Sequence, residues 1–319
     1  MMKTIYLHIG TNKTGTTSIQ KQLALHRQLL KKQGILYPTS GQAGSAHYPL
    51  SWGLGLGHPP ADYKHTPEHW LNVVNEIKHS DCEKIILSSE FFILLRNKMH
   101  AEIIRDYLSD FDVKIVVYIR RQDKYLESVY SQAVKMGAKV PSNIMDFYNN
   151  NKPSYNYFQV LMPWVEVFGK SNIKLKLYGD RKTFNAVEDF FKIIGESCPF
   201  DSSEEKRSNL SWNAHLVRFM AKHRDIFPST HERAIFVKWF NSKEQFREKG
   251  TLLNPNQRKQ VLEHHSTINK KIAKQYFDAD NLFDDSDVEK LNKSFIPVNE
   301  SQEVEKLIFK ELFAGRIKF

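Results

Sequence analysis

A glycine-containing loop near the N-terminus constrains the fold of this chain more than any other stretch. An apolar run over residues 5–9 reaches Gly10, a polar loop follows, and two threonines open a segment whose apolar residues have helical spacing. A strand, a loop and a helix start in this order form a nest of backbone N–H groups that can bind an anion. Gly10 and Gly15 have the spacing of a P-loop. However, Thr16 stands where nucleotide triphosphatases have lysine, and Lys13 lies inside the loop, so the predicted anion site has a displaced lysine.

Strand-like runs alternate with helical patterns over the first 200 residues. The runs at 84–90, 113–119 and 173–178 are typical of strands, and the segment 184–194 has helical spacing and ends at Gly195. Such alternation indicates a parallel sheet with helices on both faces. We therefore predict an α/β fold, a P-loop-like three-layer α/β/α arrangement with a central parallel sheet.

The last third of the chain is predicted to be a helical C-terminal extension. Helical patterns cover residues 211–223, 232–246, 256–277 and 302–313, and an acidic, irregular linker is expected at 281–297. No Pro/Gly/Ser-rich linker separates these helices from the preceding residues. We expect one domain over residues 1–319, with an α/β core at 1–200 and a helical part at 201–319 packed on it.

Composition and charge are those of a soluble globular protein, with 41% apolar and 26% charged residues. Lys and Arg number 46 against 36 acidic residues, giving a formal charge of +10. This surplus favours polyanionic partners, although excess lysine can equally well only solvate a surface. The two cysteines have no partners at metal-ligand spacing, which fits a reducing compartment. Without a signal peptide or a run of eighteen apolar residues, a cytoplasmic protein with no transmembrane segment is predicted.

The ends of two predicted strands bear on whether the loop uses a metal ion. A P-loop hydrolase or kinase needs Mg²⁺, held by the loop hydroxyl and by an acidic residue at the end of a second strand. Here the strands end in Ser89-Glu90 and in Arg120-Arg121, so neither offers an aspartate. A basic strand end suits an anion better than a cation, so the loop is predicted to hold phosphate without a metal.

Two motifs resemble those of the sulfotransferases that use 3′-phosphoadenosine 5′-phosphosulfate (PAPS). The 5′-phosphosulfate loop of that family reads lysine, small residue, Gly-Thr-Thr, which Lys13 to Thr17 match. The family's 3′-phosphate motif is an apolar strand ending in arginine, with a serine eight residues later, which Arg120 and Ser128 match. The chain is most similar to bacterial carbohydrate-type sulfotransferases. That similarity runs nearly end to end, including the stretches that begin at Tyr155 and Asn254.

This resemblance implies how the loop would act. Transfer of a sulfuryl group resembles phosphoryl transfer, in which the protein mostly positions groups and stabilises charge on oxygen. Lys13 would neutralise the bridging oxygen as adenosine 3′,5′-bisphosphate leaves. The backbone N–H groups and hydroxyls at the start of the helix would hold the 5′-phosphate. The loop residues expected at the cofactor are Asn12, Lys13, Thr14, Gly15, Thr16 and Thr17.

The second motif would hold the other phosphate. Arg120 is expected to form a charge-assisted pair with the 3′-phosphate, and Ser128 to donate one hydrogen bond. Arg121 is an alternative, since an offset of one residue in the strand would exchange the two arginines. The cluster Lys206–Asn209 lies where the family often has an Asn/Ser-containing segment near the cofactor, but a solvated charged surface is the favoured interpretation.

The acceptor hydroxyl needs a base, and the sequence offers two candidates. His47 lies in the long loop 39–67 and has an intrinsic pKa suited to proton removal near neutrality. Glu90 ends a strand, at the edge where open α/β sheets bind ligands. We slightly favour His47 as the base and place Glu90 near the transferred group, although either residue could have a non-catalytic role.

Other histidines and aromatic residues have simpler interpretations. His8 belongs to the first strand and is expected to be packed. Tyr48, Trp52 and Trp70 are candidates for stacking on a sugar ring, with Trp52 the best placed, and core packing is the simpler interpretation of Trp70.

The sequence therefore predicts a sulfotransferase that moves a sulfuryl group from PAPS to a hydroxyl by in-line displacement, with no metal required. The acceptor is expected to be a saccharide, polysaccharide or glycolipid, and nucleic acid is not expected as a partner. One alternative is a P-loop kinase or nucleotide hydrolase, and another is a non-catalytic polyanion-binding protein. The sequence leaves the oligomeric state open.

Overall fold

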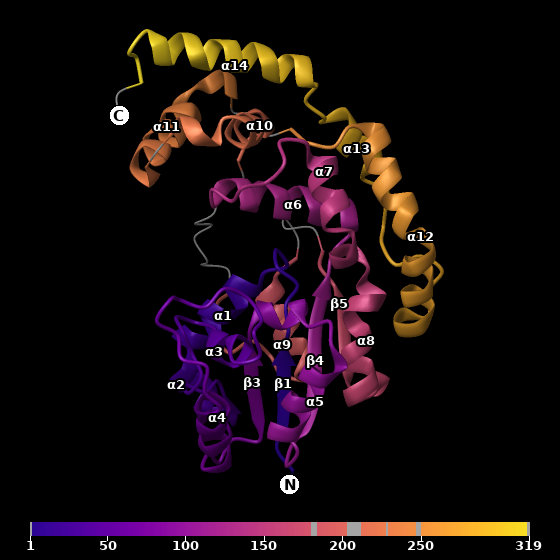
Figure 1. Ribbon diagram of the computed structural model, residues 1–319. Coiled ribbons are helices and arrows are strands. Elements are labelled where there is room, and N and C mark those ends of the chain that lie inside the picture. The colour runs from indigo at the N-terminus through magenta and orange to yellow at the C-terminus, as the bar shows by residue number, and fades with distance from the viewer. Residues whose placement is uncertain (1, 180–183, 203–211, 228, 247–249, 318–319) are drawn as a thin grey trace. The chain divides into compact units, whose positions relative to one another are not determined.

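The computed structural model describes residues 2–179, 184–202, 212–227, 229–246 and 250–317 (Figure 1). The chain forms two compact units that alternate along the sequence. The first unit comprises Met1–Arg120 and Asn156–Lys206, and the second comprises Arg121–Tyr155 and Arg207–Phe319. The units are thus not divided near residue 200, because residues 121–155 belong with the C-terminal helices. A single domain over the whole chain stays a prediction.

The first unit is built on a five-stranded sheet in which every strand pair is parallel. The strand order is β2-β3-β1-β4-β5. Each strand is rich in buried apolar residues, as expected of a parallel sheet that is covered on both faces. The strands are β1 (Thr4–His8), β2 (Ile35–Leu36), β3 (Lys84–Ser88), β4 (Asp112–Ile119) and β5 (Ile173–Leu177).

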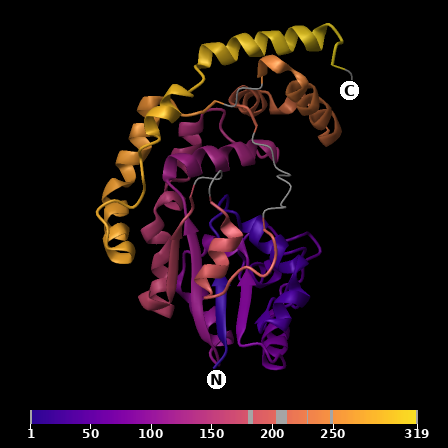
Figure 2. The same cartoon turned by 180° about the vertical axis from the view of Figure 1, so that it is seen from behind.

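Helices cover the two faces of this sheet. On one face, α1 and α9 pack together over a cluster that includes Ile86 and Val116 of the strands. On the other face, α8 packs against β4 and against α5, and Figures 1 and 2 show the two sets on opposite sides. The predicted three-layer α/β/α arrangement is therefore confirmed for this unit. Its helices are α1 (Thr16–Leu25), α2 (Arg27–Lys32), α3 (Tyr48–Trp52), α4 (Glu68–Lys78), α5 (Lys98–Tyr107), α8 (Tyr157–Phe168) and α9 (Ala186–Ile193), with 3₁₀ turns η1 (Glu90–Leu94) and η3 (Lys170–Asn172).

The second unit is helical in its described residues and has its own aromatic-rich core. Side-chain caps fix two of its helix starts: Ser229 with Glu232 for α11, and Asn254 with Gln257 for α12. The predicted irregular linker at 281–297 contains one short helix, α13, so that expectation was wrong. The helices are α6 (Gln122–Lys135), α7 (Ile144–Asn150), α10 (Ala214–Lys222), α11 (Thr230–Ser242), α12 (Pro255–Phe277), α13 (Val288–Lys293) and α14 (Val298–Phe313), with 3₁₀ turns η2 (Lys152–Tyr155), η4 (Arg224–Ile226) and η5 (Glu244–Phe246).

A buried ion network joins α6, α12 and the residue before α13. The carboxylate of Asp123 accepts from Arg258 Nη1 at 2.6 Å and from Arg121 Nε at 2.8 Å. Arg121 Nη1 also donates to Asp287 Oδ1 at 2.6 Å. Removing one partner of such a buried pair leaves an uncompensated charge and costs about 3–5 kcal/mol. The network therefore has a structural role in the second unit.

Candidate active site

Three predicted site segments meet at the carboxyl edge of the sheet. Strands β3, β1 and β4 are neighbours, and their carboxyl ends lead into Glu90, the loop 10–15 and Arg120, respectively. The chain order reverses about β1, so this edge is a topological switch point, where open α/β sheets bind ligands. The fold thus brings together in the first unit the loop, one candidate base and the candidate arginine.

The loop between β1 and α1 is held in a turned conformation. Gly10, Lys13 and Gly15 all have positive φ angles, of 94°, 67° and 82°. Lys13 is thus a non-glycine residue in the left-handed region, which costs about 1–2 kcal/mol. The Thr11 hydroxyl donates to the Tyr118 carbonyl of β4 at 2.6 Å, and the buried Thr14 hydroxyl donates to the Thr11 carbonyl. The Thr14 hydroxyl is therefore used within the loop rather than presented to a ligand.

The two glycines let the loop approach its neighbours closely. A Cβ atom on Gly10 would lie 3.0 Å from Glu90 Cα, so the loop packs directly against the start of η1. A Cβ atom on Gly15 would lie 2.6 Å from Ala186 Cβ at the start of α9. A side chain at either position would push the loop away from these contacts.

The N-terminus of α1 follows this loop directly and has backbone N–H groups that can donate to a ligand. Gly15 is the N-cap and gives no side-chain cap, and the first turn contains no acidic residue. The first N–H groups of a helix have no partner within the helix, and the helix dipole favours negative charge there. Thr16 is buried, Thr17 is exposed, and Asn12 is half-buried. The helix start is therefore suited to an anion.

Arg120 lies against the loop. Its Nη1 donates to the Lys13 carbonyl at 3.4 Å, and its guanidinium lies 5.7 Å from the centre of the Tyr178 ring. Its own carbonyl accepts from the Tyr157 hydroxyl at 2.6 Å. Arg121, by contrast, is 4% exposed and occupied by the ion network of the second unit. Of the two arginines, Arg120 is therefore the one positioned beside the loop.

Glu90 is held by two side chains of the first unit. Its Oε1 accepts from the Tyr48 hydroxyl and its Oε2 from Gln20 Nε2, each at 2.8 Å. Burial, and then the Glu90 carboxylate, raise the pKa of Tyr48, so the phenol stays a donor. Ser89, which precedes Glu90, is buried; its hydroxyl accepts from the Phe91 N–H and caps η1. The half-buried Glu90 carboxylate is thus fixed in orientation beside Gly10.

The geometry speaks against His47 as a base. The ring is fully buried, and its Nδ1 accepts from the Ser88 N–H at 3.2 Å. Because Nδ1 accepts, the proton of the neutral ring is on Nε2, which donates to the Pro38 carbonyl at 3.1 Å. Burial also lowers the pKa of His47 to about 4. Nδ1 thus joins the long loop to β3 and Nε2 joins it to Pro38, so both nitrogens are engaged, and we do not propose His47 as the base.

The other predicted aromatic residues are mostly packed. His8 is buried, its Nδ1 lies 2.8 Å from Ser88 Oγ, and burial lowers its pKa to about 3, which confirms a packed histidine. Trp70 is buried in the core, so its simpler interpretation holds and it is not available to a sugar ring; its Nε1 donates to the Leu50 carbonyl. Trp52 is only 8% exposed and packs beside Tyr48, which leaves little indole surface for a sugar ring.

One further predicted residue, Ser128, and one predicted segment, Lys206–Asn209, are not assigned to this cluster. Ser128 lies on α6 in the second unit, is half-buried, and keeps its predicted role only as a prediction. Lys206–Asn209 fall outside the described residues.

Gln20 and the contact of Tyr48 with Glu90 were not predicted from the sequence. Gln20 is 1% exposed and lies on the buried side of α1 beside Ile19 and Leu23. A polar residue one turn after the loop, on an otherwise apolar helix face, is the signal that could have indicated it. Tyr48 had no comparable signal, because its contact with Glu90 depends on how the long loop folds.

The described residues contain no group of three or more His, Cys, Asp or Glu side chains placed to hold a metal ion. Among the described helices, none combines the length and the apolar composition that are needed to cross a membrane.

Known proteins resemble parts of this chain in sequence and in fold. No family model matches the chain. An uncharacterized protein of Archaeoglobus fulgidus is 30% identical over 208 residues, which cover 62% of this chain and 55% of that protein. The chain thus spans about half the length of this relative. A solved sulfotransferase structure from Alicyclobacillus acidocaldarius is similar with a TM-score of 0.40 and 17% identity, over 65% of this chain and 87% of that one. A likeness at this level supports no conclusion about activity.

Proposed function

We propose that the chain is a sulfotransferase that moves a sulfuryl group from PAPS to a hydroxyl of a saccharide, polysaccharide or glycolipid. One observation carries the proposal. The Lys13 loop leads into an α1 start without a side-chain cap, and the Arg120 guanidinium contacts that loop through the Lys13 carbonyl. A helix start with two cationic side chains nearby suits a ligand that carries more than one anionic group.

The residues of the loop fit the donor's 5′-phosphosulfate. Backbone N–H groups of Thr16 and Thr17 would donate to the phosphate oxygens, and Gly15 permits the close approach of the backbone. Lys13 would meet the negative charge that develops on the bridging oxygen. Thr14 would contribute only through its backbone, since its hydroxyl is bonded within the loop.

Arg120 would recognise the 3′-phosphate, as the sequence motif predicts. Its guanidinium already lies beside the loop, against the Tyr178 ring, and its fork of donors matches phosphate geometry. Ser128 would add one hydrogen bond. These two roles are the features that would distinguish a 3′-phosphorylated nucleotide from AMP.

Glu90 is the base that we propose for the acceptor. The acceptor oxygen would form a bond to sulfur while the bond from sulfur to the bridging oxygen breaks, and the hydroxyl proton would pass to the Glu90 carboxylate. Tyr48 and Gln20 hold that carboxylate by one oxygen each, and each carboxylate oxygen can accept a further hydrogen bond. Both side chains would therefore act as positioning residues.

Binding and transfer assays test this function. We expect 3′,5′-ADP to bind more tightly than AMP, without Mg²⁺, and Lys13→Ala to abolish sulfate transfer from PAPS. Lys21→Ala, on α1 and exposed, is a matched control that should transfer normally. Binding of 3′,5′-ADP no tighter than AMP would contradict the proposal. Mg²⁺-dependent binding of ATP or GTP would instead favour a kinase or nucleotide hydrolase.

A further inference from the structure

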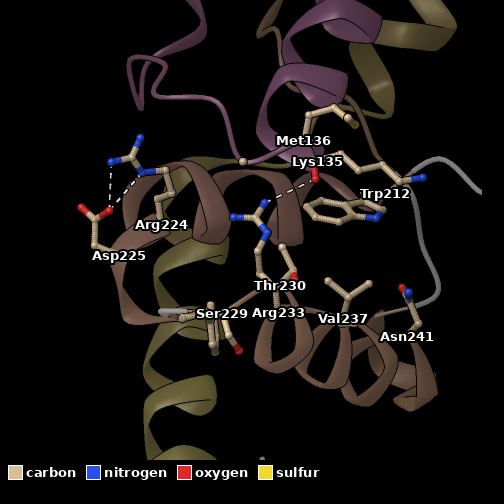
Figure 3. A pocket seen from close by; sticks show the side chains of 13 residues that line it. Lys135, Met136, Trp212, Arg224, Asp225, Ser229, Thr230, Arg233, Val237 and Asn241 are labelled. Atoms are coloured by element: carbon tan, nitrogen blue, oxygen red, sulfur yellow. Dashed lines mark hydrogen bonds and ion pairs between the residues drawn. The ribbon is translucent and has the colours of Figure 1, made fainter. Parts of the chain in front are cut away.

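The second unit contains a pocket that plays no part in the reaction described above. Its volume is about 830 Å³, which is within the range of small-molecule sites. Its lining comes from the end of α6, the turn η4 and the helix α11, together with Trp212. Figure 3 shows the Trp212 indole beside the Arg233 guanidinium, with Val237 and Asn241 on α11 close by.

Positive charge dominates the lining of this pocket. Lys135, Arg224 and Arg233 contribute three cations, and Asp225 is the acidic residue among the lining side chains. Asp225 Oδ1 already pairs with Arg224 Nη2 at 2.9 Å. The remaining positive charge is therefore available to an anionic group of a ligand.

Arg233 is the central cation. Its Nη2 donates to the Val134 carbonyl at 2.6 Å, which anchors the guanidinium at the end of α6. Burial, and then the neighbouring Arg224, lower the pKa of Arg233. A guanidinium stays protonated at neutral pH, so an anchored, partly desolvated fork of donors faces an anion with its geometry already set.

The rest of the lining is apolar and adaptable. Trp212 is half-buried and offers a flat aromatic surface, while Met136 at the rim is 74% exposed. Aromatic and apolar walls with a few fixed polar groups are typical of sites for small ring compounds. Methionine adapts to ligands of different shape.

We propose that this pocket binds an anionic saccharide, a pyranose unit that carries a carboxylate or a sulfate, with its ring on Trp212 and its charge at Arg233 and Lys135. The choice of a saccharide over a nucleotide rests on the proposed function, in which the acceptor is a saccharide and the nucleotide binds at the Lys13 loop. The presence of an anion site rests only on the pocket.

Calorimetry on the full chain tests the proposal with defined probes. Cellobiuronic acid and 6-O-sulfated cellobiose supply the two kinds of anion, cellobiose is the neutral comparison, and AMP represents nucleotides. We expect the two anionic disaccharides to bind about 10- to 100-fold more tightly than cellobiose. Equal affinity for cellobiose and the anionic disaccharides would overturn the proposal. It would also be overturned if AMP bound more tightly than the anionic disaccharides and Arg233→Gln abolished that binding.

Matched variants locate the site. Lys135→Gln should weaken binding of the anionic disaccharides about 3- to 10-fold, whereas Lys139→Gln, a nearby exposed lysine outside the lining, should not. Trp212→Leu should weaken binding of all three disaccharides, and Trp239→Phe, outside the lining, should leave it unchanged. Arg233→Lys keeps the charge but loses the fork of donors. It can therefore replace Arg233→Gln in the binding test if Arg233→Gln fails to fold. Unchanged binding in both Lys135→Gln and Trp212→Leu would place the ligand elsewhere and overturn the proposal.

Failure of this inference can be told apart from failure of the proposed function. If 3′,5′-ADP binds and Lys13→Ala abolishes transfer, but no anionic disaccharide binds, only the pocket assignment fails. If the anionic disaccharide binds with the expected variant pattern while 3′,5′-ADP does not bind, the pocket assignment holds and the proposed function fails.

Discussion

Replacing Arg120 with alanine separates two contributions of its guanidinium to ligand binding. One is the bond to the Lys13 carbonyl at 3.4 Å, which would affect every ligand at the loop. As a long bond between a charged donor and a neutral carbonyl, it contributes about 0.5–1 kcal/mol, or a factor of about 2–5 in affinity. The other is the proposed pairing with the 3′-phosphate. A hydrogen bond to a charged partner contributes about 1.5–3 kcal/mol, or a factor of about 10–150.

The assay compares two ligands in the same proteins. Calorimetric titration of Arg120→Ala should show a dissociation constant for 3′,5′-ADP that rises about 20- to several hundred-fold, while the constant for AMP rises about 2- to 5-fold. Arg120→Lys keeps the charge without the fork and should lie between these limits. Arg105→Ala, an exposed arginine of α5, is the control and should change neither constant. An equal loss for both ligands would show that Arg120 only supports the loop, and would refute its role at the 3′-phosphate.

Three other changes test Glu90, the loop at Gly15 and the packing of His47. Glu90→Gln should lower kcat about 10²- to 10⁴-fold with little change in 3′,5′-ADP binding, and a normal kcat would contradict its role as base; the exposed Glu83→Gln at the other end of β3 is the control. Gly15→Ala would place a Cβ 2.6 Å from a neighbouring Cβ and should destabilise the fold in urea by more than Gly44→Ala, which has a similar positive φ but open space; equal losses would show that the contact is unimportant. Because burial lowers the pKa of His47 to about 4, the unfolded chain binds a proton that the folded chain does not between that pKa and about pH 6.5. The contribution of His47 to the free energy of unfolding should therefore be fully present above about pH 7 and fall by about 1–2 kcal/mol towards pH 5. An unchanged pH dependence of urea unfolding in His47→Gln would contradict this.

The sheet and its layers could be predicted because their signals are local. Buried parallel strands read as short apolar runs, and amphipathic helices such as α9 repeat their apolar residues every three or four positions. The division of the chain into units could not be predicted in this way. It depends on which helices share a core, and α6 packs with α10 and α12, more than 75 residues later in the sequence.

The candidate site was predictable where a residue follows directly from a strand end. Gly10, Glu90 and Arg120 are of this kind, because parallel strands place their carboxyl ends at one edge. His47 illustrates the opposite case. A histidine in a long polar loop suggests an accessible base, but this loop folds back on β3 and the ring bonds to the backbone at both nitrogens. Sequence patterns do not record such folding.

The left-handed backbone of Lys13 sets stability against activity at a single position. Glycine would adopt its φ of 67° without a steric cost, so Lys13→Gly is expected to gain up to about 1 kcal/mol of folding free energy. The same change removes the ammonium that the proposed reaction requires. A screen for thermostable variants would therefore favour an inactive protein at this residue, while a screen for activity would retain the strained lysine. Comparing the free energies of unfolding of the variants that the two screens select at position 13 would measure how much stability the loop gives up for its charge.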